Sequence, residues 1–162
     1  MLKVQLSKDD PDIHLKGILL GQLGIPPGQP GFQLFPDGRL SQSLTWAMRV
    51  LAMTHEELTL FKQQKAKSHA ELEQKLSRDV LQAGFDTIAA VCEDVLNKYP
   101  TTEQEDTALL KDSKSLPQES AMRAAITLRR AEKKILQATI RTAKRKMSEA
   151  AGDPAPAKKA EL

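Results

Sequence analysis

The chain has 162 residues, enough for one domain with a single hydrophobic core. Its net charge is only +3, so the total charge alone does not indicate a nucleic-acid-binding protein. With 4% aromatic residues, the core must consist mainly of Leu, Ile, Val, Ala and Met, which favours helices packed on helices. The single cysteine, Cys92, excludes an intramolecular disulfide and agrees with an intracellular, reducing compartment. No apolar run approaches the roughly 20 residues that span a bilayer, so no membrane partner is expected.

The N-terminal residues alternate apolar and polar side chains, which predicts a short strand over residues 2–6. A strand needs a partner for its backbone groups, either outside the chain or in a second extended segment, residues 32–35. A helix is predicted next, with Asp10 as its N-cap and Pro11 at its first position.

The middle of the chain reads as helices with clear start signals. Helical spacing predicts a helix from Ser41, and a capping box from Thr54 to Glu57 starts the next one. The longest uninterrupted run covers residues 68–98, and Gly84 within it indicates the close approach of a neighbouring helix. The expected core stripe of this run consists of Leu81, Phe85, Ile88, Cys92 and Val95.

Two more helices are predicted near the C-terminus. Thr101 and Thr102 start a short helix with Glu103, Glu105 and Asp106 in its first turns, where the helix dipole favours negative charge. Ser115 is expected to cap the last helix, with Pro117 in its first turn. Its expected buried side consists of Met122, Ala125, Ile126, Ile135, Leu136, Ile140 and Ala143. The predicted fold is mainly α: a single-domain helical bundle with a short N-terminal strand. The domain is expected to cover residues 1–147, and a disordered tail is expected over residues 148–162.

The last helix carries a strongly basic side. Residues 117–146 are net +7 while the whole chain is +3, so the rest of the chain is net acidic. The simplest interpretation of this basic side is a helix face exposed to solvent. The next most favoured interpretation is a docking surface for an acidic protein partner. Nucleic-acid binding is less favoured, because no aromatic residues are interleaved for base stacking. The candidate docking residues are Arg123, Arg130, Lys133, Lys134, Arg141 and Lys144.

Glu132 lies among apolar positions of the same helix, so its side chain is expected to face inward. A buried carboxylate is costly unless it is hydrogen-bonded. A structural anchor that meets Thr101, Thr102 or a backbone N–H is therefore favoured over a functional acid. Trp46 is expected in the core rather than on a partner-binding surface. The histidines and Cys92 lack the spacing of a metal site, so no metal is expected.

Three blocks of the sequence resemble a known family. They are LKVQLSKDDPDIHLKGILLGQLGIP, then LSQSLTWAMRVLAMTHEEL with its central Arg49, and YPTTEQEDTALLK followed by AITLRRAEKKIL. Together they cover residues 2–142 and are similar to the helical domain that follows the SET domain in Rubisco large-subunit lysine methyltransferase and its relatives. One departure is Ala131, where the family often has glycine.

This resemblance implies a substrate-binding domain of a SET-type protein methyltransferase. It implies a protein substrate or a SET domain as partner, methylation of a lysine or, in one branch, a histidine, and structural roles for Glu132, Thr101, Thr102 and Arg49. The catalytic SET domain and its S-adenosylmethionine are expected outside this chain, because the sequence contains no SET-type asparagine–histidine element. No catalytic or cofactor-binding residue is therefore assigned.

A stand-alone helical protein-interaction module, using the basic side of the last helix, is the alternative function. The two functions predict different behaviour in solution. A substrate-binding domain detached from its SET partner should self-associate or be oligomeric, whereas a stand-alone protein should be monodisperse. Chloroplast, cytoplasm and nucleus all remain open as compartments.

Overall fold

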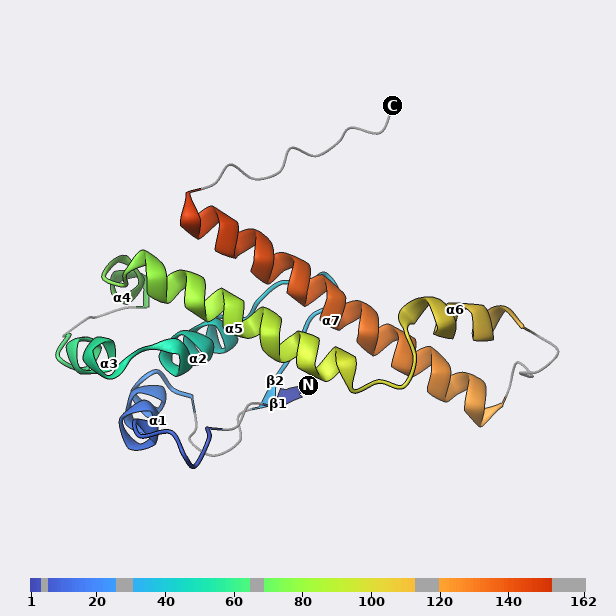
Figure 1. Ribbon diagram of the computed structural model, residues 1–162, viewed down its shortest axis with the longest axis horizontal. Helices are drawn as coiled ribbons and strands as arrows, with labels where there is room; N and C mark the ends of the chain where they lie inside the picture. Colours follow the sequence, from blue (N-terminus) through green and yellow to red (C-terminus); the bar gives the residue numbers. More distant parts are fainter. Residues whose placement is uncertain (4–5, 26–30, 65–68, 113–119, 153–162) are drawn as a thin grey trace.

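The computed structural model describes residues 1–3, 6–25, 31–64, 69–112 and 120–152 (Figure 1). Within these ranges the chain is mainly α, which confirms the expected fold class. The helices are α1 Ile13–Gln22, α2 Gln42–Ala52, α3 His55–Lys62, α4 His69–Gln74, α5 Arg78–Asn97, α6 Glu103–Lys111 and α7 Ala121–Ala151. The strands are β1 Leu2–Lys3 and β2 Gly31–Phe32. In the described part of the chain, no helix is both long and apolar enough to cross a membrane.

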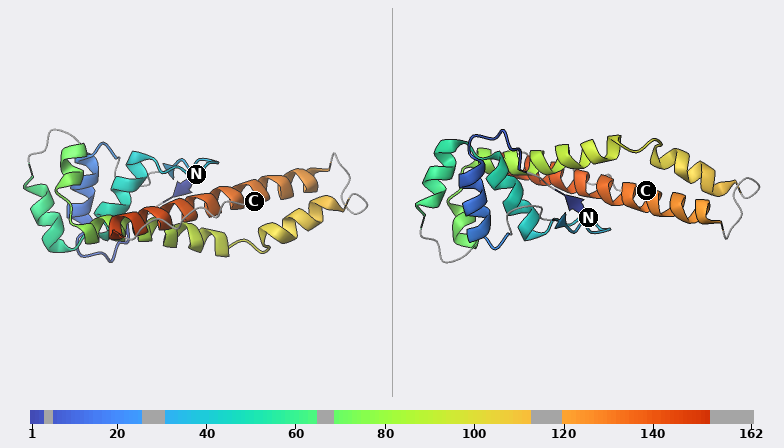
Figure 2. Two further views of the ribbon diagram at one scale, coloured as in Figure 1. Left: turned by 90° about the horizontal axis from the view of Figure 1, so that it is seen from above. Right: turned by 90° about the horizontal axis from the view of Figure 1, so that it is seen from below.

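The two longest helices, α5 and α7, run antiparallel and side by side (Figures 1 and 2). α2 packs against α5, and α1 packs against α2. Helices α1 to α4 gather at one end of the elongated molecule, whereas α6 and the first half of α7 form the opposite end (Figure 2). We call α6 together with residues 121–134 of α7 the arm.

The stripe predicted on α5 faces the core. Phe85, Ile88 and Cys92 are buried, and Val95 is half-buried against the same cluster. Their spacing of three and four residues places them on one side of the helix, as predicted. Leu81, at the start of the stripe, is only half-buried.

Trp46 is buried, 2% exposed, and its ring centroid lies 5.8 Å from that of Phe61. The expectation that this tryptophan belongs to the core is thereby confirmed, and its alternative as a surface anchor is wrong. Burial of a large aromatic side chain makes it a strong contributor to the packing of α2 on α3.

The capping box expected at Thr54 is present, and the structure adds a second one, at Thr102, that was not predicted. At the start of α3, the Thr54 hydroxyl accepts from the Glu57 N–H while the Glu57 carboxylate accepts from the Thr54 N–H. Thr102 and Glu105 make the same reciprocal pair at the start of α6. α2 was predicted to start at about Ser41, and it begins at Gln42 with Ser41 as its N-cap. Each cap satisfies backbone donors that the helix leaves unpaired.

The predicted start of α1 is wrong. α1 begins at Ile13 rather than at Pro11. The Asp10 carboxylate does act locally, but it accepts from the Asp12 N–H at 2.8 Å and from the Lys16 ammonium at 2.7 Å. These bonds hold a turn ahead of the helix, which delays the first helical residue.

The run predicted over residues 68–98 is two helices and not one. The Ser77 hydroxyl accepts from the Val80 N–H at 3.3 Å and starts α5 as a separate helix after α4. Residues 115–117, which were predicted to start the last helix, lie outside the described residues. As described, α7 begins after Ser120, whose side chain is its N-cap. α7 continues past residue 147, the expected domain boundary, to Ala151.

β1 finds its partner within the chain. Leu2 pairs with Phe32 and Lys3 with Gly31 in an antiparallel ladder. Leu2 and Phe32 are 2% and 4% exposed, so the two strands also add their apolar side chains to the core. Of the two partners left open by the sequence, the internal segment near residue 32 is the one observed.

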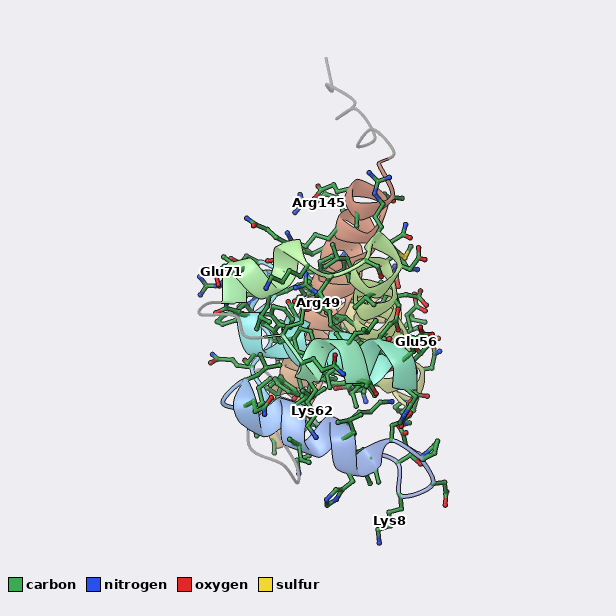
Figure 3. All side chains as sticks on the ribbon, turned by 90° about the vertical axis from the view of Figure 1, so that its left-hand side faces the viewer. Lys8, Arg49, Glu56, Lys62, Glu71 and Arg145 are labelled. Carbon is green, nitrogen blue, oxygen red and sulfur yellow. The ribbon has the colours of Figure 1, made fainter. Side chains whose placement is uncertain are left out.

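Gly84 allows α2 to lie unusually close to α5, as predicted. A Cβ at Gly84 would lie 2.6 Å from Arg49 Cγ and 3.3 Å from Arg49 Cα. Arg49 is 3% exposed and lies inside the bundle (Figure 3). Its guanidinium stacks near the rings of Trp46 and Phe85, at 5.1 and 5.5 Å from their centroids, and donates to the Glu73 carboxylate at 2.7 Å. The glycine therefore makes room for a buried cation.

Candidate functional site

A buried charge cluster joins α6 to α7. The Asp106 carboxylate, 0% exposed, accepts hydrogen bonds from Lys133 Nζ at 2.6 Å, from the Thr101 hydroxyl at 2.8 Å and from the Arg129 guanidinium. Lys133 is 1% exposed and also donates to the backbone carbonyls of Thr101 and Thr102. We call Asp106, Arg129, Lys133 and Thr101 the charge cluster. Charges at this depth are tolerated only when they are paired and hydrogen-bonded, and this cluster meets both conditions.

The charge cluster keeps Asp106 ionised. Burial is the largest single influence on the pKa of this carboxyl and raises it. The hydrogen bonds from Arg129, Lys133 and Thr101 together outweigh burial, and they hold the pKa of Asp106 well below its usual range. Asp106 is therefore a structural anion and not a proton-transfer group near neutral pH.

The expectation that Glu132 faces inward is wrong. Its side chain is exposed and accepts a hydrogen bond from the Tyr99 hydroxyl at 2.9 Å. One residue along a helix is a rotation of about 100°, so the neighbouring Lys133 takes the inward position instead. Thr101 and Thr102 accordingly contact Lys133 rather than Glu132. Partial burial, and then the Glu132 carboxylate, raise the pKa of the Tyr99 hydroxyl.

The spacing of residues along α7 could have predicted that Lys133 faces inward. Ile126, Arg129, Lys133, Leu136 and Ile140 are spaced by three, four, three and four residues, which is the spacing of a helix side that faces a core. The two cations on that side require buried acidic partners. Only the tertiary fold supplies one, from Asp106 of the preceding helix.

Several candidate docking cations of α7 already have acidic partners. Arg130 Nε lies 2.7 Å and Lys134 Nζ 3.8 Å from Glu103 Oε1. Lys144 Nζ lies 2.6 Å from Glu93 Oε1. The acidic start of α6 thus faces the basic side of α7, and much of the positive charge seen in the sequence is neutralised within the chain.

The other three candidates differ from one another. Lys133 belongs to the charge cluster, so its assignment to a surface docking site is wrong. Arg123 is half-buried and has a partner of its own. Arg141 is exposed and makes no ion pair with any residue that the structure describes.

An open apolar pocket of about 340 Å³ lies where β1, α5 and α7 meet. Its lining consists of Met1, Leu2, Lys3, Leu34, Val95, Tyr99, Glu132, Ile135 and Leu136. The hydrogen-bonded pair Tyr99 and Glu132, together with Lys3, are the polar residues of its lining. A pocket with apolar walls and a few polar groups suits an apolar side chain of a binding partner. No sequence signal pointed to it, because its walls come from segments far apart in the chain.

Large apolar side chains of the arm face solvent, and the two most exposed of them lie on α7. Met122 is 63% exposed and Leu128 is 62% exposed. Met122 and Ala125 were predicted to face the core, and this is wrong, because α6 covers only the side of α7 that carries Ile126. Exposed apolar side chains beside a pocket are typical of protein-binding surfaces.

Leu128 continues the lining of the pocket along α7. It lies four residues before Glu132 and seven before Ile135, so the three side chains share one side of the helix. We call the pocket together with Leu128 the apolar site. It is the candidate site with both the shape and the chemistry for holding part of another protein.

Cys92 is a core thiol, as its place in the α5 stripe predicted. It is 0% exposed, and burial, followed by the nearby Glu93 carboxylate, raises the pKa of its thiol to about 11. The thiol is therefore protonated near neutral pH and takes no part in the candidate site.

The family model described as Rubisco LSMT substrate-binding matches residues 7–136. No curated protein sequence matches the chain. The fold is similar to the structure of Rubisco LSMT bound to AdoMet, with 22% identity and a TM-score of 0.73 over 93% of this chain and 35% of that one. It is also similar to part of a crystal structure described as the SET domain of LSMT bound to lysine and AdoHcy, with the same identity, TM-score and coverage of this chain, and 33% of that one.

The chain thus spans about a third of the length of these solved structures. At this level of identity, the structural likeness establishes a shared fold. The family match covers most of the chain and includes α1 to α6 and the part of α7 that carries Lys133 and Leu136. This chain therefore belongs to the Rubisco LSMT substrate-binding family.

Proposed function

We propose that this chain is the substrate-binding domain of a SET-type, S-adenosylmethionine-dependent protein methyltransferase, and that it binds a protein substrate. The observation that carries this function is the match of the substrate-binding family over residues 7–136. The apolar site, which combines an open pocket with an exposed leucine, supports a protein rather than a small molecule as the ligand.

The chemistry is assigned to a SET domain outside this chain, which would hold S-adenosylmethionine as the methyl donor. The ionisable groups of the charge cluster support this division of roles, because they bind one another and serve the contact of α6 with α7. No residue of this chain is given a catalytic role.

We assign the first contact with substrate to the apolar site. An apolar side chain of the substrate would enter the pocket against Val95 and Leu136, while Leu128 covers the residues next to it. Burying one such side chain contributes roughly 1.5–3 kcal/mol, enough to position a segment without holding it irreversibly. The Tyr99 and Glu132 side chains would hydrogen-bond the backbone of that segment.

A competition experiment tests this function. The purified chain is added in excess to an extract of its source cells supplied with tritiated S-adenosylmethionine, and the labelled proteins are separated by size. By occupying the substrate, the chain should reduce the labelling of one protein while leaving others unchanged. Equal labelling with and without the chain would contradict the function.

Two variants sharpen this experiment. Leu128→Glu places a charge beside the pocket and should compete less well. Leu60→Glu is the matched control, because Leu60 is 55% exposed but lies on α3 at the other end of the molecule. If the two variants compete equally, the apolar site is not where the substrate binds.

The size of the native polypeptide distinguishes the two function classes. An antibody raised against α7 should detect a polypeptide much larger than the 17.9 kDa of this chain if a SET domain is part of the same protein. A band near 17.9 kDa would favour the alternative, a stand-alone interaction module.

A further inference from the structure

A second, smaller pocket lies between the second half of α7 and the turn at residues 36–38. Its volume is about 230 Å³, and its lining consists of Asp37, Ala138, Arg141, Thr142 and Arg145. The turn packs tightly on the helix, since a Cβ at Gly38 would lie 2.5 Å from the Ala138 carbonyl oxygen. Figure 3 shows Arg145 on the outside of α7, near the end of the helix.

The hydrogen-bond donors of this pocket are largely unused within the described structure. Arg141 makes no ion pair there, and the half-buried Thr142 hydroxyl makes no hydrogen bond with any described residue. The hydroxyls of Thr127 and Thr139, elsewhere on α7, each donate to the carbonyl four residues earlier. Arg145 has only a loose pair with Glu149, at 3.6 Å, between two exposed side chains, and such pairs contribute little.

This pocket differs from the rest of the basic side of α7. Arg129, Arg130 and Lys133 are held by acidic residues of α6, and Lys144 is held by α5. The fold therefore pairs these cations with acidic residues of other helices, whereas Arg141 makes no ion pair within the described structure and Arg145 makes only the loose pair with Glu149 on its own helix. Guanidinium groups one helical turn apart, beside a hydroxyl, form a set of donors suited to a planar oxyanion.

We infer that this pocket binds the carboxylate of an aspartate or glutamate side chain in the protein substrate, through Arg141, Thr142 and Arg145. The inference rests on the proposed function, because it names part of what the substrate must carry. The charged side chains of the lining are two arginines and Asp37, a net charge of +1, which suits one carboxylate. Asp37 is exposed and also lies 3.8 Å from Arg39 Nε, so it opposes the two arginines only in part. A phosphate group carries about −1.5 to −2 at neutral pH and would be repelled more strongly by Asp37, so it fits less well.

The two pockets lie close enough for one substrate segment to reach both. Ile135 lines the apolar site and Arg141 lines the carboxylate pocket, six residues and therefore about 9 Å further along α7. Leu34 lines the apolar pocket and Asp37, three residues later in the chain, lines the carboxylate pocket. The substrate should therefore carry an acidic residue within a few positions of its apolar anchor.

Side-chain NMR of the full chain tests the carboxylate pocket directly. The Nε–H signals of the arginines are followed while a blocked Gly-Glu-Gly peptide is added, whose only charge is the glutamate carboxylate. Arg141 and Arg145 should shift and saturate together, and a blocked Gly-Gln-Gly peptide should leave them unchanged. Tighter binding of a blocked Gly-phosphoserine-Gly peptide would overturn the assignment to a carboxylate.

Variants complete the test. Arg141→Gln should weaken binding of the glutamate peptide by about tenfold, the usual order for one charge-assisted hydrogen bond. Lys144→Gln is the matched control, because Lys144 is half exposed on the same helix but paired with Glu93, and it should leave binding unchanged. Equal loss in both variants, or no loss in either, would overturn the inference.

The competition experiment separates failure of this inference from failure of the proposed function. If wild-type chain competes and Arg141→Gln competes equally well, the pocket plays no part in substrate binding and the function stands. If the glutamate peptide binds but wild-type chain does not compete, the proposed function is overturned, and with it the assignment of the carboxylate to a substrate.

Discussion

At the scale of single residues, the charge cluster is the most demanding feature of this protein. Lys133 and Asp106 are both almost completely inaccessible, and the Lys133 ammonium donates directly to the Asp106 carboxylate. Bringing two charges out of water is unfavourable, and their attraction offsets that cost only when the remaining donors and acceptors are satisfied. Here Thr101 and Arg129 satisfy them.

Removal of Lys133 should be strongly destabilising. Lys133→Ala leaves Asp106 buried with only Arg129 to balance it, and we expect a loss of about 3 kcal/mol in the free energy of unfolding. Urea denaturation at neutral pH measures it. Lys134→Ala is the control, because the Lys134 side chain is 55% exposed and its ammonium lies 3.8 Å from the Glu103 carboxylate. The urea midpoint of this variant should stay close to that of the wild-type chain. Similar midpoints for the two variants would contradict the role of the cluster.

Acid should act on the cluster through Asp106. The folded-state pKa of this carboxyl lies below its ordinary value of 3.8, so its stabilisation is complete above that value and is lost as the pH falls toward the folded pKa. Asp106→Asn should therefore be less stable than wild type at pH 7, and the difference should shrink as the pH falls below about 4. Denaturation midpoints measured from pH 7 to pH 2 test this, and a difference independent of pH would contradict it.

At the scale of elements, the contact of α2 with α5 depends on a missing side chain. Gly84 lies against the backbone and Cγ of Arg49, so the two helices approach more closely there than any larger residue would allow. Glycine lowers the helix propensity of α5 by about 1 kcal/mol relative to alanine, and the close packing around a buried arginine offsets that cost.

A pair of glycine substitutions measures this balance. Gly84→Ala gains helix propensity but places Cβ 2.6 Å from Arg49 Cγ, so we expect a net loss of about 1–3 kcal/mol from overpacking. Gly17→Ala, in α1, meets no atom within 4 Å and should be neutral or stabilising by up to about 1 kcal/mol. Thermal unfolding compares the two. A stabilised Gly84→Ala protein would show that α2 and α5 can separate freely.

At the scale of the whole molecule, the arm is held differently from the body. The body packs α2, α5 and the second half of α7 around one apolar cluster. In α6 the only buried residue is Asp106, so this helix is held to α7 through charges and hydrogen bonds rather than through an apolar side. Elements with few buried apolar contacts open more readily than the core.

Hydrogen exchange should reveal that difference. Amides of α6 should exchange faster than those of the central turns of α5, although both segments are helical. Lys133→Ala should accelerate exchange in α6 far more than in α5, because it removes the main attachment of that helix. Exchange followed by mass spectrometry measures both. Uniform acceleration across the chain would show that the arm and the body unfold as one unit.

The helical class, the capping box at Thr54, the helix start at Thr102, the core stripe of α5 and the close approach at Gly84 could all be predicted from the sequence. These features follow from local spacing and from the chemistry of helix starts, which depend on residues a few positions apart. The family was also recognisable, because its three blocks are patterns of the same local kind.

Which charges are buried and which stay exposed could not be predicted from the sequence. From the sequence, Lys133, Arg130 and Arg141 were equivalent members of one basic side, and Glu132 was the inward carboxylate. Folding brings the acidic start of α6 against α7, so Asp106 takes Lys133 into the interior, Glu103 neutralises Arg130 and Arg141 is left exposed. The reason is physical: the energy of a charge depends on its distance from other charges and from water, and those distances are set by segments that lie far apart in the chain.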